Sequence, residues 1–265
     1  MIRVGVVGAY GKMGRAVCLA VVEDPDCVLV AAVDTSGGGE NVGAIIGHPD
    51  VDVTISDELD VLNDAEVDVA IDFTHPDAVM DDIRWCVRHA VHVVVGTTGI
   101  GQADLDEIRG LIEEEGGESN VFVAPNFAIG AVLMMRFAAA ASKFLPDVEI
   151  IELHHAKKAD APSGTALKTA EEIAKARAEG AAGSASKEVV PGARGADVSG
   201  IQVHSVRLPG LVAHQEVILG GPGQSLTIRH DSYDRASFMP GVLLAVKSIA
   251  KHPGLTYGLE NLLEP

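Results

Sequence analysis

The fold is decided by the stretch Ile2-Arg3-Val4-Gly5-Val6-Val7-Gly8-Ala9-Tyr10-Gly11-Lys12-Met13-Gly14. Residues 2–7 are a short apolar run typical of a strand, and residues 11–23 have a helical composition. The glycines between them follow the pattern G-x-x-G-x-x-G, a variant of the dinucleotide-binding fingerprint. Glycines permit a tight turn and let backbone N–H groups approach a pyrophosphate, which a helix N-terminus also favours. The stretch therefore predicts a strand, a nucleotide loop and a helix, with a plain strand-to-helix turn as the alternative.

Strand-like and helix-like runs alternate through the first half of the chain. The expected strands are 2–7, 28–33, 67–73, 92–96 and 121–124. The expected helices are 11–23, 77–89 and 103–115. Because the strands are apolar on both faces, this alternation predicts a Rossmann-like, doubly wound parallel sheet covered by helices.

The second half has a different order of elements. A helix at 129–144 precedes a strand at 148–153 and a helix at 166–180, and residues 179–199 read as a surface excursion. The β-type runs 201–208, 212–219 and 226–230 follow with short connections, and 241–251 is a final helix. Strands without helical crossovers indicate hairpins, so we expect an α+β domain with a mixed open sheet.

A composition shift near Pro125-Asn126 marks the first expected domain boundary, and we expect a second boundary near Met239-Pro240-Gly241. We expect a dinucleotide-binding domain at 1–126, and a resemblance to a known family, given below, adds residues from about 240 to 265 to that domain. The intervening residues 127–239 would form a substrate-binding and oligomerisation domain.

Polar residues at three strand ends suit a nicotinamide dinucleotide. Asp34 ends the second strand, where a carboxylate can accept the ribose hydroxyls. Residues 35–37 contain no arginine for a 2′-phosphate, so we expect NADH, although Lys12 or Arg15 leaves NADPH as an alternative. The segments 96–99 and 124–127 end two further strands and could border the nicotinamide; each alone would also suit a turn.

A second stretch carries the chemistry: Glu152-Leu153-His154-His155-Ala156-Lys157-Lys158-Ala159-Asp160-Ala161-Pro162-Ser163-Gly164-Thr165-Ala166. Its amides and hydroxyls at 163–165 open a helix and form an anion cradle. Beside two histidines and two lysines, this cradle suits a small dicarboxylate and a group that titrates near neutrality. The alternative is that these histidines and lysines are simply solvated at the surface. Because the histidines have no third ligand at diagnostic spacing, we expect no metal.

The bulk composition limits the partners. The chain has 20 Lys+Arg and 38 Asp+Glu, a net charge of −18, which argues against nucleic acids and anionic membranes. The three cysteines lack metal-ligand spacing and are expected to be reduced. We see no N-terminal signal and no apolar run of membrane-spanning length, so we expect a cytoplasmic protein.

Residues 152–166 closely resemble the signature of the dihydrodipicolinate reductase family. The resemblance extends to the Gly8 loop, Asp72-Phe73-Thr74-His75-Pro76, Gly96-Thr97-Thr98-Gly99, Ala124-Pro125-Asn126-Phe127 and His230-Asp231-Ser232-Tyr233-Asp234-Arg235. It implies reduction of 4-hydroxy-tetrahydrodipicolinate to tetrahydrodipicolinate by NAD(P)H, in the diaminopimelate route to lysine. It also implies a last helix that returns to the first domain, and a homotetramer built through the C-terminal sheets.

The resemblance also implies roles for individual residues. His154 would be the proton donor or acceptor and Lys158 the second proton donor, while His155, Gly164 and Thr165 would bind the substrate carboxylates. The cofactor would contact Gly8, Ala9, Tyr10, Gly11, Lys12, Met13, Asp34, Gly96, Thr97, Thr98, Ala124, Pro125, Asn126 and Phe127. Some family members carry an arginine where this chain has Thr35, which argues against a strong NADPH preference.

Two other functions compete with this one. Another NAD(P)-dependent reductase of a small amino or imino dicarboxylate, such as an aspartate dehydrogenase, would share the glycine loop and Asp34. It would have no reason to keep the run from His154 to Thr165. A nucleotide-sensing module without catalysis would need the glycine loop alone.

Overall fold

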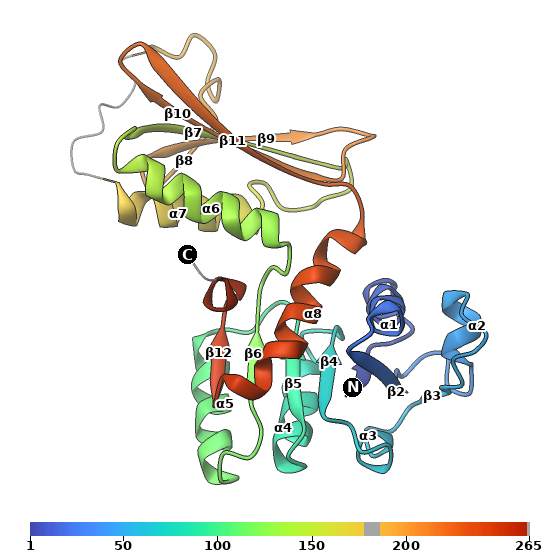
Figure 1. The fold of residues 1–265 in the computed structure, drawn as a ribbon. Coiled ribbons are helices and arrows are strands. Elements are labelled where there is room, and N and C mark those ends of the chain that lie inside the picture. Colours follow the sequence, from blue (N-terminus) through green and yellow to red (C-terminus); the bar gives the residue numbers. More distant parts are fainter. Residues whose placement is uncertain (178–185, 264–265) are drawn as a thin grey trace. The chain divides into compact units, whose positions relative to one another are not determined.

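The computed structural model describes residues 1–177 and 186–263, which form two units (Figure 1). The first unit is Met1–Phe127 with Phe238–Pro265, and the second is Ala128–Ser237. Each unit contains one sheet, parallel in the first and mixed in the second. The fold class expected from the sequence is therefore confirmed.

The first unit is built on a parallel sheet of seven strands within the described residues. In the order in which they pair, the strands are β12 (Leu255–Tyr257), β6 (Val121–Val123), β5 (His92–Val95), β4 (Val69–Asp72), β1 (Ile2–Val7), β2 (Cys27–Val33) and β3 (Ile55–Ser56). The chain runs outward from β1 in one direction and from β4 in the other. Ligands bind at such a switch point, beyond the carboxyl ends of the strands.

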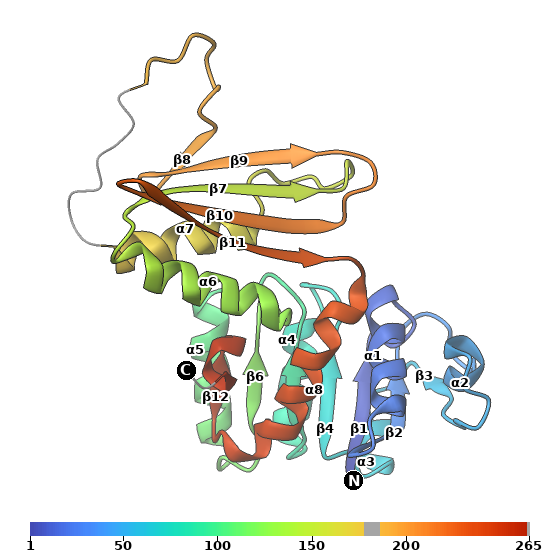
Figure 2. The same ribbon diagram turned by 45° about the horizontal axis from the view of Figure 1, so that its top comes forward.

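Helices cover both faces of this sheet (Figure 2). Helices α1 (Lys12–Glu23) and α8 (Met239–Ser248) contact each other on one face, and α4 (Val79–Arg88) and α5 (Gln102–Glu114) contact each other on the opposite face. Strands β4 and β6, which both have a neighbour on each side, are buried along their whole length, which explains their apolar runs. One polar residue breaks this pattern: Asp72, the last residue of β4, is 0% exposed.

Two parts of the first unit contain short elements that the sequence analysis did not predict, although it did predict the helix that corresponds to α8. Residues 35–63 contain α2 (Val42–Ile46), β3 and α3 (Val61–Asp64), and the Asn41 side chain caps α2 by accepting the Ala44 N–H. These elements are short, so they carry too few residues for a periodic signal. The last segment contains η1 (Arg235–Phe238), α8, η2 (Ile249–Lys251), β12 and η3 (Leu259–Leu262). An ion pair of 2.7 Å from Lys247 Nζ to Asp24 Oδ2 links α8 to the turn after α1.

The second unit has a mixed five-stranded sheet within the described residues. Its strands pair in the order β11 (Gln224–Ser232), β10 (Ala213–Gly221), β7 (Asp147–His154), β9 (Ile201–Arg207) and β8 (Ala196–Val198). Only the β7–β9 pair is parallel among these pairings. Helices α6 (Ile129–Ser142) and α7 (Gly164–Ala176) contact each other and pack on the sheet. In β7 the odd and even positions alternate, which buries Ile150 and Glu152.

Most expected boundaries differ from the structure by one to three residues, as helix and strand ends usually do. The helix expected at 166–180 begins at Gly164 and ends at Ala176, and the end of that prediction, from residue 178, lies outside the described residues. The surface excursion expected at 179–199 is described only from residue 186. From there its residues are mostly exposed and include β8.

Candidate active site

The glycine loop after β1 leaves no room for side chains at two of its glycines. Gly8 has φ +81°, and a Cβ there would lie 2.6 Å from the carbonyl oxygen of Phe73. A Cβ on Gly14 would lie 2.0 Å from the Gly8 carbonyl oxygen. The loop therefore packs tightly against the segment after β4, and the backbone at the start of α1 carries no side-chain cap among the described residues. A bare helix N-terminus behind a glycine turn fits a pyrophosphate.

Asp34 stands at the end of β2 with both carboxylate oxygens engaged. Its Oδ2 accepts the Tyr10 N–H at 2.8 Å, and its Oδ1 accepts the Ser36 N–H at 2.8 Å. These bonds tie the expected ribose-binding carboxylate to the glycine loop. The Arg15 guanidinium lies 4.3 Å from the centre of the Tyr10 ring and donates from Nε to the Tyr10 carbonyl. Arg15 is therefore held at this loop.

The other expected cofactor residues lie at the same edge of the sheet, because all these strands are parallel. Residues 96–98 follow β5, and 124–127 follow β6. A Cβ on Gly96 would lie 2.1 Å from the Phe73 ring, so this ring covers the loop after β5. Phe127 is 2% exposed, with its ring centre 6.0 Å from that of Phe73. Thr98 is exposed, whereas Thr97 is buried.

Buried Asp72 ties two of these loops together. Its Oδ1 accepts the Thr97 hydroxyl at 2.7 Å, and it accepts the backbone N–H and the hydroxyl of Thr74 at 3.0 and 2.9 Å. Since the Thr97 hydroxyl gives its proton to Asp72, it could meet a nicotinamide only as a hydrogen-bond acceptor.

In the second unit, a buried carboxylate holds His154. Glu152 is 0% exposed, and its Oε2 lies 2.5 Å from His154 Nδ1. The Arg207 guanidinium donates to both oxygens of Glu152, at 2.8 and 2.7 Å, and to the Asp160 carbonyl at 2.6 Å. The Ser163 N–H donates to Glu152 Oε1 at 3.2 Å. One carboxylate thus joins the end of β7, the end of β9 and the start of α7.

These contacts set the protonation of the pair. Burial acts to raise the pKa of Glu152, but the hydrogen bonds from Arg207, Ser205 and His154 outweigh it and bring that pKa below its ordinary value. Burial lowers the pKa of His154, against the hydrogen bond and charge of Glu152. A neutral His154 that donates Nδ1–H to Glu152 keeps its Nε2 as a proton acceptor.

Lys158 is the partly buried cation of this loop. Its Nζ lies 2.7 Å from Asp160 Oδ1, and its side chain is 24% exposed. His155 and Lys157 are exposed. The structure therefore separates the four basic residues of the cluster, with His154 and Lys158 partly buried and their neighbours in solvent.

The turn before α7, where we expected an anion cradle, uses Ser163 within the protein, because its N–H donates to Glu152. The peptide bond Ala161–Pro162 is cis, and buried Ser163 caps the helix by accepting the Ala166 N–H at 3.3 Å. Gly164, the first residue of α7, is exposed, and Thr165 is partly exposed. A ligand oxygen can therefore approach the backbone of both residues.

Sequence reasoning missed the residues that hold the site in place, chiefly Glu152, Arg207 and Asp72. A signal for two of them was present, because each acid interrupts an apolar strand and a buried acid needs partners. Arg207 had no such signal, because its place beside Glu152 depends on the pairing of β9 with β7.

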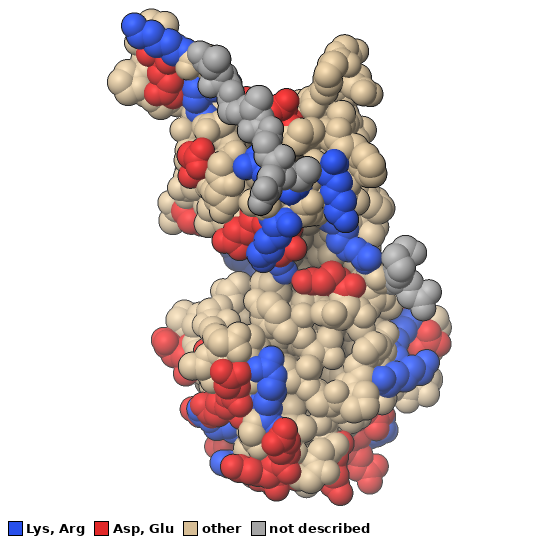
Figure 3. All heavy atoms as spheres, turned by 90° about the vertical axis from the view of Figure 1, so that its left-hand side faces the viewer, with Lys and Arg blue, Asp and Glu red and all other residues tan. Residues whose placement is uncertain are grey.

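Other features of the described residues carry no site. No group of three or more His, Cys, Asp or Glu among them could hold a metal ion, and no described helix is long and apolar enough to cross a membrane. All three cysteines are free and buried. On the face drawn in Figure 3, Lys and Arg side chains lie interspersed with Asp and Glu.

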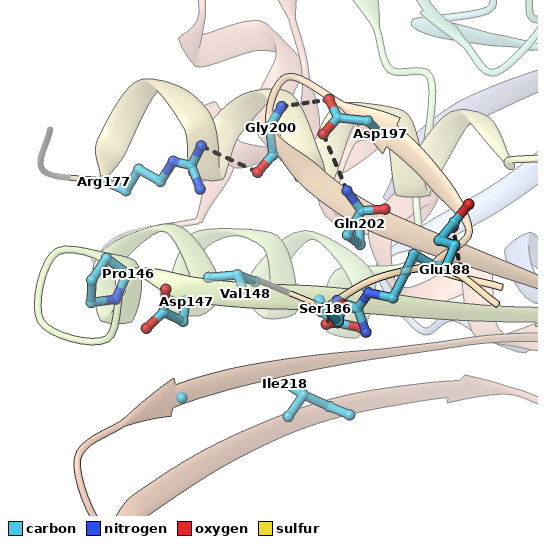
Figure 4. Close-up of a pocket in the computed structure, with 13 residues that line it drawn as sticks. Pro146, Asp147, Val148, Arg177, Ser186, Glu188, Asp197, Gly200, Gln202 and Ile218 are labelled. Atoms are coloured by element: carbon cyan, nitrogen blue, oxygen red, sulfur yellow. Dashed lines mark hydrogen bonds and ion pairs between the residues drawn. The ribbon is translucent and has the colours of Figure 1, made fainter. Parts of the chain in front are cut away.

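A pocket of about 920 Å³ lies in the second unit, away from the expected site residues (Figure 4). It is lined by the start of β7, the end of α7 and the segment around β8. Most of its charged groups are already bonded: Arg177 donates to the Gly200 carbonyl, Asp197 accepts from Gly200 and Gln202, and Glu188 accepts from two backbone N–H groups. Because these groups satisfy one another, size alone does not make the pocket the active site.

Comparisons with known proteins agree over the whole chain. The family models "Dihydrodipicolinate reductase, N-terminus" and "Dihydrodipicolinate reductase, C-terminus" match residues 2–127 and 130–263. The chain is 52% identical to the 4-hydroxy-tetrahydrodipicolinate reductase of Nocardia farcinica, over 99% of each chain. It is 49% identical to that of Syntrophomonas wolfei, over 98% of each chain.

Solved structures give the same result. The structure "Dipicolinate bound Dihydrodipicolinate reductase from Paenisporosarcina sp. TG-14" matches with a TM-score of 0.87 and 44% identity, over 99% of this chain and 100% of that one. An amine dehydrogenase from Mycobacterium smegmatis, at 13% identity and a TM-score of 0.65 over 95% and 93% of the chains, shares the fold alone. With both halves matched and close relatives along its full length, the chain belongs to the dihydrodipicolinate reductase family.

Proposed function

We propose that this chain reduces 4-hydroxy-tetrahydrodipicolinate to tetrahydrodipicolinate with a hydride from NAD(P)H, in the diaminopimelate route to lysine. The observation that carries the proposal is the match of both family models together with about 50% identity to reductases of that name. The dipicolinate bound to the Paenisporosarcina relative supports a small dicarboxylate as the ligand.

The first unit would bind the dinucleotide at the carboxyl edge of its parallel sheet. The Gly8 loop and the bare N-terminus of α1 fit a pyrophosphate, and Asp34 fits a ribose. When bound, the nicotinamide supplies the hydride. Residues 96–98 and 124–127 would border it, with Phe73 and Phe127 excluding water from the edge.

We propose NADH as the preferred cofactor. A 2′-phosphate needs a cation beside the ribose, and the residue after Asp34 is the neutral Thr35. Arg15, the nearby alternative, is bonded to the Tyr10 carbonyl and stacked on its ring. The carboxylate of Asp34 would repel a 2′-phosphate.

The second unit would bind the substrate through its carboxylates and handle the proton. Gly164, which is exposed, Thr165, which is partly exposed, and the side chain of His155 would hold the carboxylates. Loss of water from the 4-hydroxy substrate gives a conjugated imine. Addition of a hydride to this imine places negative charge on the substrate, which the Lys158 ammonium would stabilise and then neutralise by giving its proton. Neutral His154, fixed by Glu152, would accept or return a proton at Nε2.

We also propose a homotetramer built through the sheet of the second unit. The family resemblance supports it, and so does the one-sided cover of this sheet, because the described helices α6 and α7 contact each other on it. Analytical ultracentrifugation tests this assembly: a mass near four times 27.5 kDa is expected, and a monomer would contradict it.

The function is tested by following NADH oxidation with the condensation product of pyruvate and aspartate semialdehyde, made in the assay. NADPH is run in parallel, and pyridine-2,6-dicarboxylate is titrated with and without NADH. Turnover and NADH-dependent binding of the dicarboxylate are expected. A folded protein that binds NADH but neither turns over nor binds the dicarboxylate would overturn the proposal.

A further inference from the structure

We propose that Asp82 on α4 shares a proton with Asp72, and that this carboxyl pair positions the loops that border the cofactor site. Asp82 is then a positioning residue that acts through Asp72. The role at the cofactor rests on the proposed function, whereas the shared proton rests on the geometry of the first unit alone.

The first step is the set of bonds on one oxygen of Asp72. Oδ1 accepts from the Thr97 hydroxyl, the Thr74 hydroxyl and the Thr74 N–H, all within 3.0 Å. Two of these donors belong to the turn after β4, and the third belongs to the loop after β5. The fully buried carboxylate therefore fixes these two segments to each other.

The second step is the other oxygen. Asp72 Oδ2 is buried and has no hydrogen-bond donor among the described residues. A buried carboxylate oxygen without a donor is costly. The carboxyl of Asp82 is bonded to that of Asp72, and its Oδ2 lies 3.3 Å from the Thr74 hydroxyl, whose single proton is already donated to Asp72 Oδ1. A carboxyl can donate only when it is protonated, so a proton on Asp82 supplies the missing donor.

The surroundings favour that proton. Burial raises the pKa of Asp82 to about 7, and the charge of Asp72, its hydrogen bond and the charge of Asp81 act in the same direction. Burial also raises the pKa of Asp72. The Cys86 thiol on α4 is buried and its pKa is raised, so it stays neutral. The described ion pairs between α4 and α5 join Arg84 to Glu107 and Arg88 to Glu115, and no described cation bonds to Asp72 or Asp82.

The third step connects the pair to the ligand edge. The turn held by Asp72 contains Phe73, whose carbonyl packs against Gly8 and whose ring covers Gly96. The same carboxylate holds Thr97, inside the loop expected at the nicotinamide. Loss of the shared proton leaves two carboxylates in contact, and their repulsion would loosen both loops. Cofactor affinity should therefore fall as Asp82 ionises.

The shared proton is tested without any ligand. The carboxyl carbons of aspartate are labelled with ¹³C, and their NMR shifts are followed with pH in the free protein. One carboxyl should titrate near pH 7, and its signal should be lost in Asp82→Asn but kept in the control Asp106→Asn, an exposed acid on α5. If every aspartate titrates below about pH 5, near the ordinary range, the proposal is wrong.

The positioning role is tested by NADH fluorescence titrations. If only the protonated pair binds, the apparent Kd of the wild type should rise about tenfold from about pH 6 to about pH 8. In Asp82→Asn the amide donates to Asp72 at every pH, so the Kd should be independent of pH. In Asp82→Ala the donor is gone. The Kd should therefore be about tenfold higher at both pH values, because one buried donor is lost.

Equal pH dependence in the wild type and Asp82→Asn would overturn the positioning role. Failure of the proposed function gives a different result: the wild type would not bind NADH at any pH, while the carboxyl titration would still show whether the proton is shared.

Discussion

Two fully buried carboxylates stand at the ends of strands, one in each unit, and they are stabilised in opposite ways. Glu152 at the end of β7 is bonded to Arg207 and His154, and its pKa is lowered. Asp72 at the end of β4 is bonded to threonines and lies against Asp82, and its pKa is raised. Burial alone raises the pKa of an acid, so the partners decide the outcome.

The difference suits what each region would bind. A fixed charge at Glu152 holds His154 by Nδ1, which leaves Nε2 for the proton transfer that we propose in the second unit. A shared proton at Asp72 and Asp82 keeps extra negative charge away from an edge that we propose for an anionic dinucleotide. The predictions below test this contrast, from the largest expected effect to the smallest.

Removal of the Lys158 ammonium from the second unit should lower catalysis without affecting cofactor binding. Lys158→Ala should lower kcat by about 10²–10⁴-fold, the usual contribution of a proton donor, while NADH binding in the first unit survives. The control is Lys157→Ala, which removes an exposed neighbour and should have little effect. Steady-state kinetics and NADH titration measure both quantities, and a joint loss of turnover and NADH binding would contradict the assignment.

Removal of the partner of Glu152 should show the cost of a fixed buried charge. Arg207→Met should lower the free energy of unfolding by about 3–5 kcal/mol, because it leaves the buried carboxylate without its cation. Arg194→Met is the matched control, since its ion pair with Glu149 is about one-third exposed and should be worth about 1 kcal/mol or less. Urea unfolding measures the free energy of unfolding of both variants. Equal losses would show that the pair of Arg207 and Glu152 stabilises the fold no more than the pair of Arg194 and Glu149.

A cation added to the first region should change its cofactor preference. Thr35→Arg should improve kcat/KM with NADPH by about tenfold relative to NADH, because the guanidinium can pair with the 2′-phosphate. Thr35→Gln provides similar bulk without charge. If both variants shift the ratio equally, charge at this position is not what selects the cofactor.

The pH dependence of stability should differ in sign between the two regions. Folded Asp82 keeps its proton to about pH 7, so its contribution to stability is full at low pH and is lost as the pH rises toward that value. Glu152, with its lowered pKa, contributes stability above its unfolded pKa that is lost as the pH falls. The Tm difference between Asp82→Asn and the wild type should therefore shift by about 3 °C in favour of the variant as the pH rises from about 5 to about 8. Scanning calorimetry measures this difference. A constant difference across this range would contradict the raised pKa of Asp82.

Much of the site could be expected from the sequence because its signals are local. The glycine pattern from Gly8 to Gly14, the apolar strands and the run from Glu152 to Ala166 each depend on neighbours in the chain. The family resemblance then supplied residue roles that no single pattern could give. The roles of Glu152 and Asp72 were not expected, since each depends on a partner from another element.

The sequence by itself determined the two kinds of sheet, the position of the glycine loop and the family of the enzyme, because hydrophobic periodicity and short motifs are local properties. Only the tertiary structure decided that Arg207, on β9, reaches Glu152, and that Thr97 and Asp82 meet at Asp72. Strand pairing and helix packing bring these residues together from 10 to 55 positions apart in the sequence. The pKa of a buried acid depends on the charges and hydrogen-bond donors that the fold places beside it.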